Sequence, residues 1–231
     1  MVNEAKSKGA RVFVNFGNRF NPPFALLKEE VSKGALGELV YAYLRLSDTI
    51  YVPTKMLSWA SRTSVVYFLM SHTADLARWI LGSEVKRVRA YASFKVLKSL
   101  GMDIPDHVLA VLDFQNGSRG VLESGWILPE SYPSIVEFKA EFIGTKGYAL
   151  IDSTQQGLHI ASETFSYPRF LSSSEINQRF FGFVRESISH IVESLVEGRE
   201  PIISEEDGLR NVRILDAITR SYKEGKEIII S

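Results

Sequence analysis

The feature that most constrains the fold is a succession of short strand-like segments in the middle of the chain. Residues 85–152 contain five runs rich in β-branched and aromatic residues, each followed by turn-forming residues. Asn116-Gly117 and Gly-Thr-Lys-Gly at 144–147 are typical of tight hairpin turns. Connections this short join antiparallel neighbours. The pattern therefore predicts a mostly antiparallel sheet, with strands at 85–96, 107–114, 120–125, 135–143 and 148–152.

Helical patterns flank these strands. Apolar residues recur at helical spacing in 64–82, 176–196 and 209–222, and Ser204 with Asp207 forms a near variant of the capping box before the last of them. Asn21 and Pro22 predict the start of a further helix, after a helix end at 3–9 and a strand at 11–16. A strand at 39–46 completes the pattern. We expect an α+β fold, with an open, mostly antiparallel sheet and helices covering one face.

The charge balance excludes several classes of partner. Among the 231 residues, 27 Lys and Arg balance 27 Asp and Glu, so no global field attracts nucleic acid. The apolar run at 65–81 is too short to span a membrane and contains charged residues. The chain has no cysteine, which fits a reducing compartment. Together with a polar N-terminal segment, this predicts a cytoplasmic protein that contacts neither nucleic acid nor membrane.

The apolar segment 64–82 carries the best candidate for chemistry. His72, Asp75 and Trp79 fall on one helical face because they are spaced i, i+3 and i+7. A buried imidazole and carboxylate are retained where they are paired or do chemistry. From these residues alone, a core histidine bonded to a backbone carbonyl remains an alternative to a reactive one. His72 and Asp75 could form half of a metal site, but no further ligands are evident, so no metal is expected.

Four stretches, taken in order, resemble the C-terminal domain of the Gfo/Idh/MocA oxidoreductases, the family of glucose–fructose oxidoreductase and inositol dehydrogenase. They are VFVNFGNRFNPPFALLKEEVSKGALGEL, SHTADLARWILG, FIGTKGYALID and VEGREPIISEEDGLRNVRILDAITRSYKEGKEI, and together they span nearly the whole chain. The resemblance implies a dihydrodipicolinate-reductase-like C-terminal domain at 21–231. It also implies that residues 1–20 correspond to the end of an N-terminal Rossmann domain.

The resemblance also implies a cofactor, NAD or NADP. The chain contains neither the family's Glu-Lys-Pro segment nor a G-x-G-x-x-G motif after a strand. We therefore expect that this chain alone does not bind the dinucleotide tightly. A fragment, a misplaced start, or one half of a split enzyme with a separate Rossmann half would each account for this.

In such enzymes a carbinol carbon loses hydride to nicotinamide while its hydroxyl loses a proton. The resemblance implies that His72 is the base or a hydrogen-bonding partner of the reacting oxygen, a role that suits its ordinary pKa. Many relatives carry an aspartate one turn earlier, where this chain has Phe68. The substitution makes the pocket more apolar, so either His72 acts without that carboxylate or the member is divergent.

The resemblance assigns roles to further residues. Trp59, Phe68 and Arg19 are expected to contact the substrate, and Asn18 and Arg19 to face the cofactor. For Arg19, packing at the domain boundary is an equal alternative. Asp75 and Trp79 are expected to be structural, with Asp75 anchoring a backbone group or an arginine.

The expected function is that of the substrate domain of an NAD(P)-dependent oxidoreductase acting on a sugar, cyclitol or similar polyol. Two alternatives remain open: an inactive binding or assembly module, and an NAD-dependent glycosidase. An open sheet predicts a homodimer or tetramer, and the aromatic residues of the strands are compatible with it: Tyr41, Tyr43, Phe114, Phe138 and Phe142.

Overall fold

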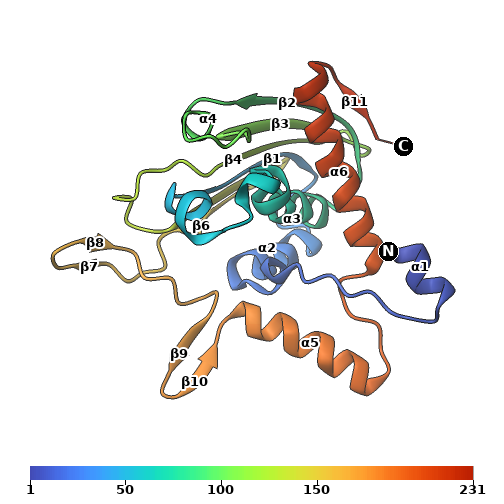
Figure 1. The fold of residues 1–231 in the computed structure, drawn as a ribbon. Coiled ribbons are helices and arrows are strands. Elements are labelled where there is room, and N and C mark those ends of the chain that lie inside the picture. The colour runs from blue at the N-terminus through green and yellow to red at the C-terminus, as the bar shows by residue number, and fades with distance from the viewer. Residues whose placement is uncertain (231) are drawn as a thin grey trace.

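A computed structural model describes residues 1–230, and its centre is a seven-stranded sheet (Figure 1). Across the sheet the strands follow the order β11-β2-β3-β4-β1-β5-β6. Their bounds, in that order, are Ile228–Ile229, Val85–Ser93, His107–Phe114, Arg119–Gly125, Leu39–Asp48, Val136–Gly144 and Tyr148–Asp152. All neighbours are antiparallel except β1 and β4, which run parallel. The predicted fold class is confirmed.

Both predicted hairpin turns are present. Gly117, at a φ of 90°, turns the chain between β3 and β4, a conformation that glycine adopts without steric cost. The second turn joins β5 to β6, and the Gly144 amide donates to the Gly147 carbonyl across it. An added Cβ at Gly144 would lie 2.1 Å from the Leu36 carbonyl oxygen, so only glycine fits there.

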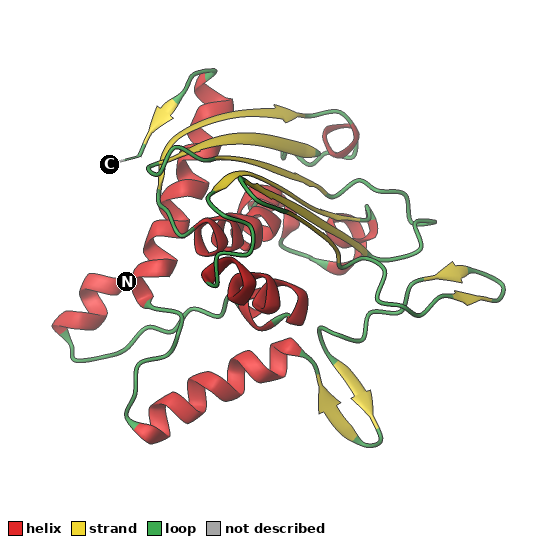
Figure 2. Cartoon of the chain, turned by 180° about the vertical axis from the view of Figure 1, so that it is seen from behind, coloured by secondary structure: helices red, strands yellow, loops and turns green. Residues whose placement is uncertain are grey.

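Three helices cover one face of the sheet, as Figures 1 and 2 show from opposite sides: α2 (Pro22–Ser32), α3 (Ser71–Leu81) and α6 (Glu205–Glu224). The core lies between these layers. Strand residues such as Leu44 and Leu122 belong to one core cluster with Leu76 of α3 and Ile218 of α6, and all four are fully buried. Helix α6 begins with the predicted capping box, in which the Ser204 hydroxyl accepts from the Asp207 amide.

The remaining elements lie outside this core. They are the helices α1 (Val2–Ser7), α4 (Val96–Ser99) and α5 (Phe183–Glu197), and the hairpins β7 (Ile160–Ala161) with β8 (Phe165–Ser166) and β9 (Ser174–Ile176) with β10 (Arg179–Phe181). Both hairpins project from the body of the molecule (Figure 1). Four short helical turns complete the chain: η1 (Gly17–Phe20), η2 (Val52–Met56), η3 (Ala60–Arg62) and η4 (Val66–Met70).

Two sequence predictions of local structure are wrong. Residues 11–16 alternate like a strand but pair with no other strand among the described residues, and a strand needs a partner for its backbone groups. The helix predicted from Asn21 and Pro22 does begin there, although the Asn21 side chain makes no capping hydrogen bond. Residues 176–182 are not helical, because Asn177 and Gln178 both have positive φ, as in a type I′ hairpin turn.

The outer face of the sheet is open, but fewer aromatic residues line it than expected. Phe114, Phe138 and Phe142 point into the core. On the outer face Tyr41 of β1 pairs with Ile143 of β5, which in turn pairs with Tyr148 of β6. The Ile143 and Tyr148 side chains are 42% and 55% exposed. Among the described residues, no helix is long and apolar enough to cross a membrane.

Candidate active site

Helix α3 and the turn before it position the histidine. The apolar segment begins as the π-helical turn η4, continues as α3 from Ser71, and ends at Gly82, which adopts the left-handed conformation typical of helix C-termini. Leu76 and Ile80 face the core and are fully buried. The helix is therefore held in place by packing, and His72 lies in its first turn.

His72 is half-buried, and its Nδ1 atom is buried without a hydrogen-bond partner among the described residues. Burial lowers the pKa of the His72 imidazole from its ordinary value. A lowered pKa keeps the ring neutral at pH 7, so it can accept a proton. Among the described residues no backbone carbonyl bonds to this Nδ1 atom.

Phe68 and Trp59 lie together in an aromatic cluster. The Phe68 ring centroid lies 5.7 Å from that of Trp59, edge to face, and 6.3 Å from that of Trp126. Trp126 is fully buried and donates from Nε1 to the Pro105 carbonyl, whereas Trp59 is 40% exposed. The cluster thus runs from the core to the surface along η4, the turn that leads into the helix of His72.

Arg19, Asp75 and Trp79 form a second group. Arg19 donates from Nε and Nη2 to the two carboxylate oxygens of Asp75, at 2.9 and 2.6 Å, and its guanidinium carbon lies 5.6 Å from the Trp79 ring centroid. Both charged side chains are at least 95% buried. Burial raises the pKa of Asp75, and the adjacent Arg19 opposes that shift. The neighbouring Asn18 is half-buried in η1.

The ion pairs continue into α6. Arg19 Nη2 also lies 3.1 Å from Asp207, which lies 3.6 Å from Arg78, and Arg78 makes two 2.8 Å hydrogen bonds to Glu84. These contacts tie η1, α3 and α6 together. Arg19 is therefore engaged by two carboxylates, and it is grouped with Asp75 and Trp79 rather than with His72.

Sequence reasoning missed Asp48, the last residue of β1. Asp48 is 2% exposed, and its Oδ1 atom has no hydrogen-bond partner among the described residues. Burial raises the pKa of Asp48 to about 7, although the charge of Arg169 opposes the shift. The signal was present in the sequence, because Ala42, Leu44, Leu46 and Asp48 alternate onto the inner face of the sheet.

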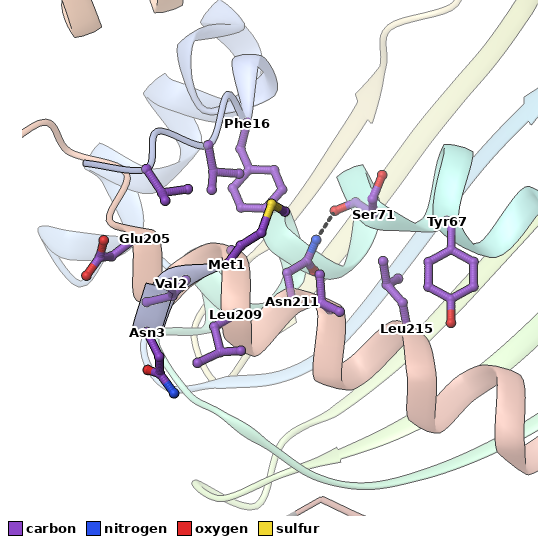
Figure 3. A pocket seen from close by; sticks show the side chains of 14 residues that line it. Met1, Val2, Asn3, Phe16, Tyr67, Ser71, Glu205, Leu209, Asn211 and Leu215 are labelled. Carbon is purple, nitrogen blue, oxygen red and sulfur yellow. Dashed lines mark hydrogen bonds between the residues drawn. The ribbon is translucent and has the colours of Figure 1, made fainter. Parts of the chain in front are cut away.

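A separate apolar pocket of about 540 Å³ lies beside α6 (Figure 3). Phe16, Leu209 and Leu215 supply apolar walls, and the Asn211 amide donates to the Ser71 carbonyl at 2.9 Å. His72 is not among its lining residues. Within residues 1–230, no three His, Asp or Glu side chains are grouped as a metal site would require.

Comparisons with known proteins match most of the chain. The family model "Oxidoreductase family, C-terminal alpha/beta domain" of the GFO/IDH/MocA oxidoreductases matches residues 28–230. The chain is 24% identical to a scyllo-inositol 2-dehydrogenase (NAD(+)) of Bacillus subtilis, over 97% of this chain and 64% of that protein. It is also 24% identical to a myo-inositol 2-dehydrogenase of Thermotoga maritima, over 99% of this chain and 67% of that protein.

Solved structures show the same fold. The crystal structure of a scyllo-inositol dehydrogenase from Lactobacillus casei, with bound NAD(H) and scyllo-inositol, has a TM-score of 0.77 at 18% identity and covers 98% of this chain and 66% of that one. A probable dehydrogenase from Thermotoga maritima has a TM-score of 0.78 at 22% identity, over 99% and 68%. The chain thus spans about two thirds of the length of these relatives. With a matching family model and a shared fold, the chain belongs to the Gfo/Idh/MocA oxidoreductase family, of which it is a C-terminal α/β domain.

Proposed function

We propose that this chain is the substrate domain of an NAD(P)-dependent oxidoreductase that acts on a cyclitol or a similar polyol. The observation that carries the proposal is His72, a half-buried histidine with a free Nδ1 and a lowered pKa, on a helix within the matched region. Three of the four relatives named above are inositol dehydrogenases, which supports a cyclitol as the substrate class.

In this proposal His72 handles the proton. A neutral imidazole accepts the hydroxyl proton as the carbinol carbon is oxidised, and general bases of this kind contribute about 10²- to 10⁴-fold to rate. Trp59 and Phe68 would pack against the apolar face of the substrate ring. Arg19, held by Asp75, would act by fixing η1 against α3, and Asn18 would face the cofactor from the same turn.

No Rossmann unit is present among the described residues. Only β1 and β4 are parallel, and neither leads into a glycine-rich turn and a helix, as a Rossmann unit requires. We propose that a Rossmann domain, with residues 1–20 as its last part, supplies NAD or NADP. Residues 21–231 would then be the substrate and oligomerisation domain.

The outer face of the sheet supports a homodimer or tetramer. Ile143, Tyr148 and Leu150 are 42%, 55% and 60% exposed on β5 and β6. A second copy packed face to face would remove these side chains from water. The oligomeric state, measured by light scattering for wild type and for a Tyr148→Lys, Leu150→Lys variant, tests this interface.

A second candidate function is a binding or assembly module without dehydrogenase activity. The observation in its favour is Phe68, which packs on Trp59 and Trp126 at the position where the resemblance implies a carboxylate. An assay of the native protein or complex that contains this chain separates the two. NAD(P)⁺ reduction with myo- or scyllo-inositol supports the enzyme. Saturable cyclitol binding without any reduction, with a Rossmann domain present and loaded, supports the module.

A further inference from the structure

A second cleft, of about 690 Å³, lies beside η4. Its walls come from residues 61–64, from the connection between β2 and β3, and from the last turns of α6. Tyr67 of η4 lines this cleft, whereas its neighbour Phe68 packs on Trp126. The volume is in the range of small-molecule sites.

The cleft carries an excess of positive charge. Arg62, Lys98 and Lys223 line it, and Asp103 is the one carboxylate among its lining residues. Within residues 1–230 none of these four side chains lies within 4 Å of an oppositely charged group, whereas Arg78 and Arg210, which line a different pocket, are both paired with Glu84. Unpaired cations converging on one concave surface favour an anionic ligand.

Aromatic rings and hydroxyls line the same space. The Phe94 and Tyr222 ring centroids lie 6.3 Å apart, and Phe94 and Tyr67 are 38% and 42% exposed. Ser64 is 7% exposed, and its hydroxyl is buried without a hydrogen-bond partner among the described residues. A buried hydroxyl that the protein leaves without a partner calls for an explanation, and a bound ligand that draws this side chain toward the cleft would supply one.

We propose that this cleft binds an anionic sugar, a pyranose that carries a phosphate or carboxylate group. Lys98, Lys223 and Arg62 would hold the anionic group through charge-assisted hydrogen bonds. Phe94 and Tyr67 would contact the apolar face of the ring, and the Ser64 hydroxyl would bond to a ring hydroxyl. The anion accounts for the cations, and the sugar ring accounts for the aromatic and hydroxyl groups.

This proposal does not depend on dehydrogenase activity, since it concerns residues that the proposed reaction does not use. Direct titration calorimetry on the chain tests it, with glucose 6-phosphate, glucuronate, glucose and inorganic phosphate as probes. At least one charged sugar is expected to bind at least tenfold more tightly than glucose and than phosphate. The comparison of glucose 6-phosphate with glucuronate shows which anionic group is preferred.

Two sets of variants locate the site. Lys98→Gln with Lys223→Gln, and separately Phe94→Ala, are expected to weaken binding of the charged sugar at least tenfold. The matched control is Lys146→Gln with Arg213→Gln, which removes the same charge from exposed positions elsewhere, and it should retain wild-type affinity. Equal binding of phosphate and the charged sugars, equal loss in the control, or no binding at millimolar concentrations would each overturn the proposal.

Discussion

Arg19 and Asp75 lie 56 positions apart in the chain, yet they meet through two hydrogen bonds of 2.9 and 2.6 Å in the interior. The pair joins the turn η1 to the middle of α3, and Asp207 extends it to α6. Removing Asp75 would leave the buried Arg19 with only the part-exposed Asp207 as a counter-ion, which is more costly than removing both members of the pair.

Asp75→Ala should therefore lower the free energy of unfolding by about 3–5 kcal/mol. The double change Arg19→Met with Asp75→Leu should recover much of that loss, because apolar groups of similar volume tolerate burial. Urea unfolding at pH 7 measures both, with Asp216→Ala at an exposed position as the control. A single variant as stable as this control would show that the pair does not hold η1 on α3.

The buried Asp48 leads to a prediction about how the stability of the fold depends on pH. Its pKa is raised by burial to about 7, so the folded protein keeps a proton that the unfolded chain releases above about pH 4. The contribution of this group to stability therefore falls as the pH rises from about 4 to about 7, and levels off above. Asp48→Asn should flatten this dependence and stabilise the fold at pH 8 by a few kcal/mol, on the order set by the shift.

Unfolding in urea at pH 4.5, 6 and 8 tests the Asp48 prediction. The matched control is Asp216→Asn, which makes the same chemical change at an exposed position. The role of Asp48 would be refuted by a variant whose stability follows the wild-type pH profile.

The pKa shift of His72 is opposite in direction to that of Asp48, and so is the pH dependence of stability that it predicts. Its pKa is lowered by burial, so below about pH 6.5 the unfolded chain gains a proton that the folded protein resists. Stability should fall as the pH drops from 7 to 5, and His72→Gln should reduce that fall. The exposed His159→Gln is the control. Equal acid sensitivity in the wild type and in both variants would place His72 in a solvated environment.

Much of the architecture could be predicted from the sequence, since strand alternation and the two glycine-containing turns act locally. The wrong predictions concern segments whose state depends on partners. Residues 11–16 have the alternation of a strand, but no neighbouring strand among the described residues pairs with them. The alternation of a segment does not show whether such a partner strand is present. Residues 176–182 read as helical because the apolar spacing of α5 continues into a hairpin whose turn is set by two positive φ angles.

The site was predictable in its residues but not in their grouping. Helical spacing placed His72, Asp75 and Trp79 on one face, but the spacing could not show that Arg19 would come to Asp75 and Trp79 from η1. Asp48 could have been found from its place in the inner-face alternation of β1. Whether the Oδ1 atom of Asp48 has a hydrogen-bond partner depends on which loop residues the fold brings near it, and the sequence pattern does not reveal those residues.

Cofactor binding makes a further prediction. Because the described residues form no Rossmann unit, NADH fluorescence should show no saturable binding to this chain at micromolar concentrations. A truncated relative's Rossmann domain, titrated under the same conditions, is the positive control. Nanomolar to low-micromolar binding by the chain alone would contradict the proposal that another domain supplies the cofactor site.

The most direct test of the proposed function is the turnover of His72→Ala, measured as NAD(P)⁺ reduction by the native protein or complex with its best cyclitol. Loss of the base should lower kcat at least 100-fold while the melting temperature stays within a few degrees of wild type. His159→Ala should retain wild-type turnover. Unchanged turnover in His72→Ala would contradict the central claim that this histidine carries the proton.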